Sequence, residues 1–460
     1  METILKTDCK FLENELMDVV RLFEARPGNV AHSFVYRDGV FYNRFSVDGK
    51  EYSFEDEGQV SGEIEYKRME RRFGKLGLYA ILSDLYQEKM PWGALTGIRP
   101  TKLAYMEKES GRDFRALFEK MRVSEENISL VEEVLKAQEG ICEKKDGNTD
   151  FFVSIPFCPT KCSYCSFITA PIDKTRQFLP SYLDCLEREI VACKPLVGKL
   201  RSVYIGGGTP LVLEAGDLER VLKAVEKVRD SACEYTVEAG RPDVFTEEKL
   251  ALLKNYGVTR ICVNPQSFSD KTLERIGRRH TAADLYRAFD MAAKFGFEIN
   301  ADLIAGLTDE SFEEFAFSVR EAVKTGAENI TVHCLCLKSG ARLKEECSYL
   351  ENPVVSDMVA ASREILRGAG YVPYYMYRQK YQAGNNENVG WTKPGKACVY
   401  NIDIMEETAD NLAAGANAVS KRVFNAENRI ERFASQKDLK TYIGKIDEII
   451  ERKNKFFGQI

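Results

Sequence analysis

The sequence predicts an α/β protein: a partial barrel of six strand–helix units, an N-terminal α+β region and a mostly helical C-terminal region. From residue 150 onward, short apolar runs alternate with amphipathic segments at helical spacing, such as 177–192, 217–228 and 281–295. Such alternation is typical of parallel strands joined by right-handed crossovers. The predicted strands lie near residues 151–155, 203–205, 235–238, 260–263, 298–304 and 329–334.

The length of 460 residues suits two or three domains. In the first region, residues 33–55 alternate polar and apolar around Asp38-Gly39 and Asp48-Gly49, two dipeptides that favour hairpin turns. Helical patterns follow within 67–90 and 101–138. The predicted domains are 1–147, 148–345 and 346–460.

Composition narrows the class of partner. The net charge of −6 gives no electrostatic case for nucleic acid or an anionic membrane surface. No apolar run is long enough to span a bilayer, and the opening residues have no secretory signal pattern. Thirteen cysteines without such a signal indicate a reducing compartment, so we expect a cytoplasmic location.

A short cysteine loop follows the first predicted strand. Residues 151–167 read FFVSIPFCPTKCSYCSF, with Pro156 ending the apolar run and Cys158, Cys162 and Cys165 beyond it. Three thiolates in one loop suit a [4Fe–4S] cluster, whose fourth iron then stays open for a chelating ligand. The alternatives are a structural zinc site or plain packing. Zinc sites usually need four ligands, and no second C-x2-C pair exists in the chain.

The other predicted strands also end in groups that can bind ligands. The residues in question are Gly206–Gly208, Glu238, Gln266, Asp302 and His333. In barrels of parallel strands the chemistry sits at the carboxyl ends, so we expect all six ends to share one rim. The glycine run lets backbone approach a ligand closely, or it forms only a tight turn. It is not a dinucleotide fingerprint, because Leu211 replaces the third glycine.

These motifs resemble a known family. The spacing C-x3-C-x-aromatic-C, with Tyr164 as the aromatic residue, is similar to the radical S-adenosylmethionine (SAM) signature. The lead-in VSIPFC resembles oxygen-independent coproporphyrinogen III oxidases and their relatives. Three more segments resemble the HemZ-type branch, called coproporphyrinogen dehydrogenase: PWGALTGIRPTK at 91–102, YYMYRQKYQAGNNENVGWTKPGKACVYN at 374–401 and AAGANAVSKR at 413–422.

The resemblance implies a radical SAM (β/α)6 barrel with two cofactors, a [4Fe–4S] cluster and SAM. It implies that Cys158, Cys162 and Cys165 hold the cluster. It assigns SAM contacts to Phe152, Tyr164, Gly207, Gly208, Thr209, Glu238, Gln266, Arg279, Asp302 and Ile304, with Arg278 as an alternative to Arg279.

The implied reaction is the oxygen-independent oxidative decarboxylation of coproporphyrinogen III propionates to vinyl groups. This reaction requires a tetrapyrrole substrate and an electron donor of the flavodoxin or ferredoxin type. Tyr377, Arg378 and Lys380 are candidate substrate residues, within a C-terminal group of aromatic and cationic side chains that also includes Tyr374, Tyr375, Trp391, Lys393 and Lys396.

Three positions depart from the family pattern and leave other functions open. Phe152 and Ser154 stand where the family often has Tyr and His, and Phe167 replaces a further cysteine. The Phe167 pattern also occurs in related haem chaperones, so a haem-binding chaperone is one alternative. Another is a radical SAM enzyme that acts on a different substrate, such as another tetrapyrrole or tRNA.

Overall fold

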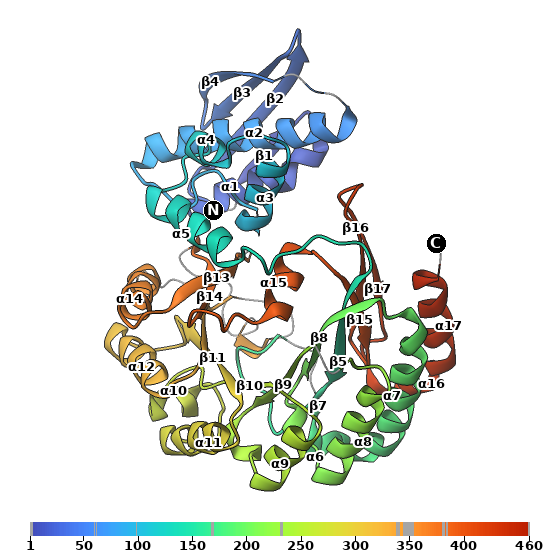
Figure 1. The fold of residues 1–460 in the computed structure, drawn as a ribbon. Coiled ribbons are helices and arrows are strands. Elements are labelled where there is room, and N and C mark those ends of the chain that lie inside the picture. Colours follow the sequence, from blue (N-terminus) through green and yellow to red (C-terminus); the bar gives the residue numbers. More distant parts are fainter. Residues whose placement is uncertain are drawn as a thin grey trace. The chain divides into compact units, whose positions relative to one another are not determined.

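The computed structural model describes residues 3–58, 60, 62–97, 99–166, 170–230, 233–336, 341–343, 354–379, 382 and 385–458. The chain forms two compact units, Met1–Glu132 and Glu133–Ile460. Residues 148–345 and 346–460, expected as separate domains, contribute strands to one sheet and belong to one unit. The first unit is drawn in blue and teal and the second in green to red (Figure 1).

The first unit combines a four-stranded sheet with helices. Its sheet has the order β1-β2-β3-β4, with β1 parallel to β2 and the other pairs antiparallel. The strands are β1 (Ile4–Thr7), β2 (Asn29–Arg37), β3 (Val40–Val47) and β4 (Lys50–Glu57). The helices are α1 (Glu13–Leu22), α2 (Glu63–Tyr86), α3 (Pro100–Glu109), α4 (Phe114–Lys120) and α5 (Glu125–Ala137), which runs across the unit boundary.

Both predicted hairpin turns are confirmed. Asp38-Gly39 joins β2 to β3 and Asp48-Gly49 joins β3 to β4. All four residues have positive φ, between 47° and 85°. Two-residue hairpin loops of this kind need left-handed backbone at both positions, which Asp and Gly tolerate better than most residues.

Helix α2 carries basic residues whose partners lie within the first unit. Arg72 pairs with the buried Glu107 at 3.3 Å, and Lys75 pairs with Glu15 at 3.2 Å. These cations are therefore part of the internal structure of this unit.

The second unit is built on one eleven-stranded sheet. Its order is β13-β14-β12-β11-β10-β9-β8-β5-β15-β16-β17. The six strands expected from the sequence form its parallel centre: β5 (Asn148–Ile155), β8 (Lys199–Gly207), β9 (Glu234–Gly240), β10 (Arg260–Val263), β11 (Glu298–Ala305) and β12 (Asn329–Cys334). The partial (β/α)6 barrel is thereby confirmed.

The C-terminal region extends this sheet at both edges. Strand β14 (Asn388–Thr392) pairs antiparallel with β12 and with β13 (Val372–Tyr377). At the other edge β15 (Asp410–Ala414) pairs parallel with β5, followed by β16 (Val419–Phe424) and β17 (Arg429–Ala434). The helices of this region are α14 (Val354–Gly368), α15 (Val399–Glu406), α16 (Leu439–Gly444) and α17 (Ile446–Phe457).

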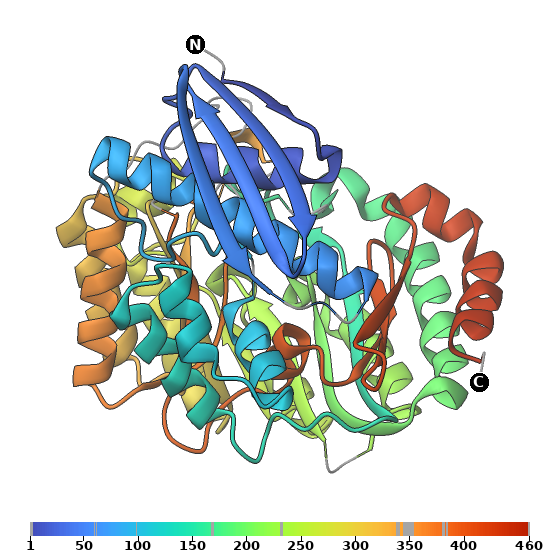
Figure 2. The same ribbon diagram turned by 90° about the horizontal axis from the view of Figure 1, so that it is seen from above.

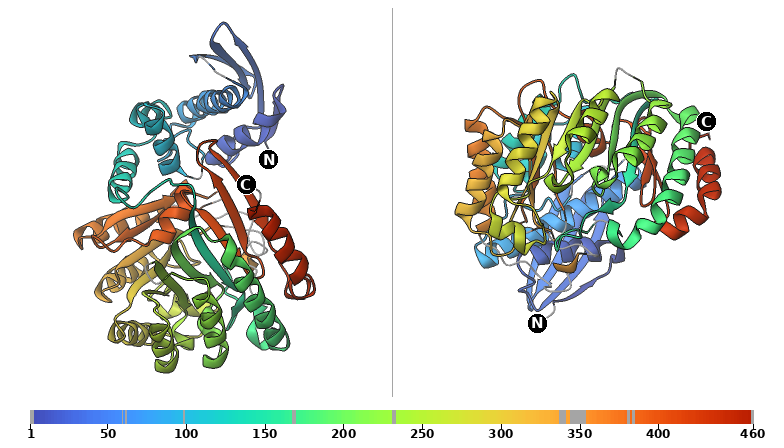
Figure 3. Two further views of the ribbon diagram at one scale, coloured as in Figure 1. Left: turned by 45° about the vertical axis from the view of Figure 1, so that its right-hand side comes forward. Right: turned by 90° about the horizontal axis from the view of Figure 1, so that it is seen from below.

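Helices between the central strands cover the outer face of the curved sheet (Figures 1 and 3). They are α7 (Leu179–Cys193), α8 (Ala215–Glu226), α9 (Glu247–Asn255), α10 (Asp270–Arg275), α11 (Ala282–Lys294) and α12 (Phe312–Lys324). Capping boxes begin two of them: Thr281 with Asp284 at α11, and Ser311 with Glu314 at α12. Central strands such as β5 and β10 are buried on both faces. A ligand can therefore contact them mainly at their carboxyl ends.

The C-terminal helices pack beside α7 (Figure 2). Lys453 of α17 pairs with Glu189 of α7 in the interior, and Tyr442 of α16 donates a 2.7 Å hydrogen bond to the same carboxylate. In the parts of the chain that the structure describes, no helix has the length and apolar character needed to cross a membrane.

Candidate active site

One cavity of about 370 Å³ lies at the carboxyl ends of the central strands. This is within the usual size range of small-molecule sites. Each of the six strands supplies it with a side chain or backbone segment foreseen from the sequence: the cysteine loop after β5, Gly207 and Gly208, Glu238, Gln266, Asp302 and His333. The expectation of a shared rim is therefore confirmed.

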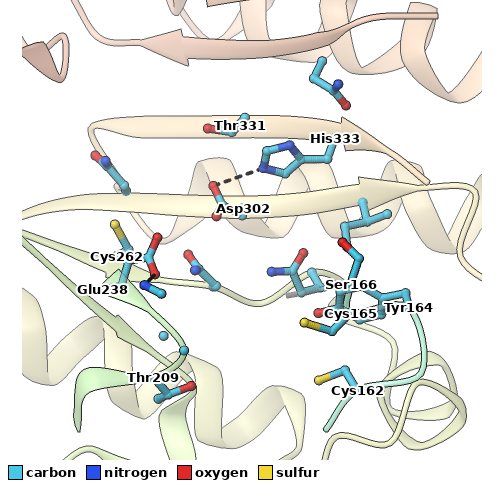
Figure 4. A pocket seen from close by; sticks show the side chains of 18 of the residues that line it. Cys162, Tyr164, Cys165, Ser166, Thr209, Glu238, Cys262, Asp302, Thr331 and His333 are labelled. Atoms are coloured by element: carbon cyan, nitrogen blue, oxygen red, sulfur yellow. Dashed lines mark hydrogen bonds and ion pairs between the residues drawn. The ribbon is translucent and has the colours of Figure 1, made fainter. Parts of the chain in front are cut away.

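The cysteine loop forms one wall of this cavity. Cys158, Cys162 and Cys165 all line it, and the sulfur atoms of Cys162 and Cys165 face the open space (Figure 4). Cys158 belongs to the short strand β6 (Phe157–Cys158), where the hydroxyl of Thr209 lies 3.6 Å from its sulfur. A backbone bond from Cys165 N to Cys162 O closes the turn between the other two. Phe167 lies outside the described residues.

The glycine run is dictated by close backbone packing. Gly207 has φ +104°, a conformation that side chains disfavour. A Cβ at Gly208 would come within 2.4 Å of the Phe157 carbonyl oxygen, so no other residue fits there. The backbone amides of Gly208 and Thr209 donate to Ile155 and Phe157 at 2.8 Å each. The run is thus a tight turn whose bare backbone faces the cavity beside the cysteine loop.

Glu238 is a half-buried carboxylate on the neighbouring strand β9. Its Oε1 accepts a 2.8 Å hydrogen bond from the Tyr204 hydroxyl, and its Oε2 accepts one of 3.2 Å from the Gly207 amide. Burial raises the pKa of Glu238 to about 7, and the nearby Asp302 adds to the rise because like charges repel. Two carboxylates in one cavity favour a ligand with positive charge and hydroxyl or amino donors.

Asp302 continues into a chain of polar side chains. Its Oδ1 lies 3.6 Å from Nε2 of His333, as Figure 4 shows. Nδ1 of His333 lies 3.0 Å from the hydroxyl of Tyr377 in β13. Burial raises the pKa of Tyr377, so its hydroxyl meets His333 as a neutral hydrogen-bonding group at neutral pH. All three residues line the cavity, so the C-terminal region completes one wall.

Gln266 and Asn264 offer side-chain oxygen atoms that have no hydrogen-bond partner among the residues described. The side-chain oxygens Gln266 Oε1 and Asn264 Oδ1 are buried and accept no hydrogen bond there. Both residues line the cavity. Buried polar atoms in native proteins normally have partners, so these two indicate a bound molecule with N–H or O–H donors.

The arginine at the cavity is Arg278, which corrects the assignment of Arg279. Arg278 is 8% exposed, lines the cavity and donates a 3.2 Å hydrogen bond to the hydroxyl of Tyr164. Arg279 is exposed and lies outside the cavity wall, because adjacent side chains leave the backbone on different sides. The sequence alone could not choose between two neighbouring arginines.

The remaining predicted SAM residues occupy two layers. Tyr164, Thr209 and Ile304 line the cavity. Phe152 lies behind it, where its ring stacks on Tyr204 with 6.2 Å between ring centroids. Tyr204 thus stands between Phe152 and the site, a position the sequence reading missed. The sequence did hold one sign of this position: successive residues of a strand face opposite sides of the sheet. Tyr204 stands between the buried Val203 and Ile205, so its side chain lies on the other face from theirs.

The structure separates the candidate substrate residues. Tyr377 lines the cavity, but Arg378 is buried outside its wall and donates a 2.7 Å hydrogen bond to Asn385. Lys380 lies outside the described residues. Lys396 pairs with Glu298 at the amino end of β11, on the opposite rim of the sheet, where Lys393 binds the Gly326 carbonyl. These two lysines cannot serve the site, because an antiparallel strand carries them back to the other rim.

The donor set fits the two cofactors. Cys158, Cys162 and Cys165 would hold the cluster, and the glycine run, Glu238, Gln266 and Asp302 would hold SAM. Among the residues described, no three His, Cys, Asp or Glu side chains converge on a point that suits a single metal ion. Thiolate ligands of a cubane cluster do not need to converge in this way, because each binds a different iron.

Sequence comparison places the chain in a protein class. The model of the radical SAM superfamily matches residues 152–320, which hold the cysteine loop and most of the central strands. The fold agrees: a coproporphyrinogen III oxidase (HemN) from Escherichia coli, described as a radical SAM enzyme, matches with a TM-score of 0.54, covering 68% of this chain and 72% of that one at 22% identity. The chain is a radical SAM protein, and the cofactors of that superfamily are a [4Fe–4S] cluster and SAM.

Full-length relatives narrow the class to a family. The oxygen-independent coproporphyrinogen-III oxidase-like protein HemZ of Bacillus subtilis is 36% identical over 389 residues, which cover 80% of this chain and 77% of the relative. The heme chaperone HemW of Haemophilus influenzae is 28% identical over 313 residues, covering 66% and 77%. The chain therefore belongs to the family of coproporphyrinogen-III oxidase-like radical SAM proteins.

Proposed function

We propose that this protein is a radical SAM enzyme that oxidatively decarboxylates propionate side chains of coproporphyrinogen III. One observation carries the proposal: a single cavity is walled on one side by the cysteine loop and on the other by His333 and Tyr377. A substrate held against the second wall faces the groups that would bind the cofactors. The 36% identity to the oxidase-like relative supports a tetrapyrrole as this substrate.

The cluster and SAM, when bound, supply abstraction of a hydrogen atom. Each propionate side chain then gives up one hydrogen atom, which ends in 5′-deoxyadenosine, one molecule of CO2, and one electron, which passes to an oxidised one-electron carrier; a vinyl group remains. Protoporphyrinogen IX forms after two such events. A one-electron donor of the flavodoxin or ferredoxin type is needed to start each cycle.

The chain's own residues would bind and orient the reactants. Glu238 and Asp302 would accept hydrogen bonds from the amino group or the ribose hydroxyls of SAM. The buried, orphaned oxygens of Asn264 and Gln266 would accept from its adenine or ribose donors. Tyr377, held by His333, would present its oxygen to the substrate. The apolar residues below the rim exclude water from the reacting groups.

The test is a complete reconstitution. The full chain is loaded anaerobically with iron and sulfide, then given SAM, a reductant and coproporphyrinogen III. Mass spectrometry quantifies 5′-deoxyadenosine and porphyrin products together. Protoporphyrinogen IX with matching 5′-deoxyadenosine supports the proposal. 5′-Deoxyadenosine without a decarboxylated product points to another tetrapyrrole.

A second candidate is a haem chaperone, favoured by the HemW relatives that match more than half of the chain. Of the three histidines in the chain, only His333 lines the cavity. His32 belongs to the first unit, and His280 is buried with 3.8 Å between its Nδ1 and Asp243. Stoichiometric haem binding that His333→Gln abolishes, together with no 5′-deoxyadenosine from a cluster-loaded protein, would favour the chaperone.

A further inference from the structure

Tyr204 and Glu238 are joined across two adjacent parallel strands. Tyr204 in β8 donates to one carboxylate oxygen at 2.8 Å, and the Gly207 amide of the same strand donates to the other at 3.2 Å. A Cβ at Gly206 would come within 2.9 Å of this carboxylate, so the group is packed tightly against β8. Both oxygens are therefore fixed in direction before any ligand arrives.

Tyr204 is itself held from two sides. Its ring stacks on Tyr400 of α15 with centroids 4.3 Å apart and planes 20° apart. Its hydroxyl also lies 3.7 Å from the sulfur of Cys262 in β10, which can donate to it. The phenol is thus oriented toward Glu238.

We propose that Tyr204 is a positioning residue for SAM: it orients Glu238 and favours its ionised form as an acceptor for the amino group or ribose hydroxyls of that cofactor. The proposal rests on SAM as the cofactor of the superfamily and does not depend on the tetrapyrrole. Failure of the proposed decarboxylation would therefore leave it standing. Sequence reading overlooked Tyr204, since it belongs to no motif.

The surroundings of Glu238 disfavour its ionised form, so hydrogen bonds to the carboxylate are needed to keep it ionised. The charged group that faces it is Asp302 of β11, and the thiol of Cys262 in β10 lies beside it (Figure 4). Tyr400 of α15 and Cys398 at the N-cap of this helix lie near Tyr204. Burial and the negative charge of Asp302 favour the neutral form of Glu238. Only the Tyr204 hydroxyl and the Gly207 amide oppose them, because hydrogen bonds to the ionised form lower the pKa.

Loss of the Tyr204 hydroxyl should change the pKa of Glu238 and, through it, the affinity for SAM. The pKa of Glu238 is about 7 with Tyr204 in place. Removing the hydroxyl raises this pKa further, so the acid is mostly protonated at neutral pH. A protonated carboxyl accepts more weakly from an ammonium group. SAM affinity should therefore rise with pH as Glu238 ionises, and Tyr204→Phe should move this rise to higher pH.

The experiment measures SAM affinity by calorimetry on the cluster-loaded full chain, between about pH 6 and about pH 9, anaerobically. Tyr204→Phe is expected to weaken SAM binding about tenfold near pH 7, the order expected for one hydrogen bond to a charged group. The difference in SAM affinity between Tyr204→Phe and the parent should be smaller near pH 9, because Glu238 then ionises in both proteins. Tyr235→Phe is the matched control, because Tyr235 is a buried tyrosine of the adjacent strand β9 whose ring lies against Arg229 and outside the cavity wall. This variant should shift neither the SAM affinity nor its pH profile.

A second measurement does not need SAM. Infrared difference spectra of the SAM-free protein follow the carbonyl band of the protonated carboxyl, assigned by its absence in Glu238→Gln. The midpoint should lie higher in Tyr204→Phe than in the parent. An unchanged midpoint with unchanged SAM affinity would overturn the proposal. If Tyr204→Phe does not fold, the SAM affinity of Glu238→Gln is measured against pH instead. A Glu238→Gln protein whose SAM affinity keeps the pH dependence of the parent would also overturn the proposal.

Discussion

Nδ1 of His333 lies 3.0 Å from the hydroxyl of Tyr377, which joins the last central strand to the C-terminal strand β13 at the rim of the cavity. The carboxylate of Asp302 on the other side of the imidazole favours a proton on Nε2, so Nδ1 is left to accept from Tyr377. Through this contact the C-terminal region takes part in the site.

Removing the Tyr377 hydroxyl should therefore affect the substrate and not SAM. Tyr377→Phe is expected to lower the rate of product formation about tenfold, the effect of one lost hydrogen bond of roughly 1.4 kcal/mol. SAM affinity should stay within twofold of the parent. Lys396→Ala is the control, because Lys396 lies on the opposite rim and pairs with Glu298. An equal rate loss in Lys396→Ala would contradict this placement.

The cluster should depend on each thiol of the cysteine loop. Cys162→Ser is expected to lack the iron–sulfur absorbance and to form no 5′-deoxyadenosine, since a serine hydroxyl is a poor ligand for iron in such clusters. Cys185→Ser is the matched control: this thiol is also buried, but it lies in α7, 3.8 Å from the Ile443 carbonyl oxygen. Iron and sulfide analysis of both variants decides the point. A fully loaded Cys162→Ser protein would refute the assignment.

Breaking the interior ion pair of Glu189 with Lys453 should destabilise the protein strongly. Lys453→Met leaves Glu189 buried with an uncompensated charge, which typically costs about 3–5 kcal/mol. The melting temperature of Lys453→Met, measured by calorimetry, should be clearly lower than that of the parent. Lys455→Met changes the same residue type on an exposed position of the same helix and should melt like the parent. Equal melting temperatures for both variants would contradict the argument.

Glu310 should make stability depend on pH. Burial raises the pKa of Glu310 to about 7, although Ser267 donates to it at 2.6 Å. Because the folded pKa lies above the unfolded one, the stabilisation is complete below about pH 4.5 and is lost as pH rises through about 7. Glu310→Gln should remove this loss, so its gain in stability over the parent should grow from about pH 4.5 and reach about 3 kcal/mol near pH 7.

Denaturant titrations at several pH values test this prediction. Glu313→Gln is the control, since Glu313 is exposed on α12. A difference between Glu310→Gln and the parent that does not change with pH would show that folding does not shift the pKa of Glu310, contrary to the argument.

The sequence predicted the central strands well, because each is a short apolar run bounded by turn residues. It also identified most of the rim, since parallel strands must present their carboxyl ends together. Strands β13–β17 were not foreseen, because their partners are β12 and β5, far away in the sequence. Lys393 and Lys396 looked like substrate groups for the same reason: only the antiparallel pairing of β14 shows that they lie at the other rim.

Tyr204 and Arg278 illustrate the remaining limit. Arg278 lies beside the predicted Arg279, and only the backbone direction decides which of the two faces the cavity. The local sequence pattern could predict on which face of its strand Tyr204 lies. It could not predict the contact with Glu238, which belongs to another strand.

The most direct measurement uses coproporphyrinogen III with deuterium on the propionate carbons. The cluster-loaded chain receives this substrate, SAM and a reductant, and mass spectrometry follows deuterium into 5′-deoxyadenosine. The account predicts one deuterium in each 5′-deoxyadenosine for each vinyl group formed. Unlabelled 5′-deoxyadenosine beside an unchanged tetrapyrrole would contradict it.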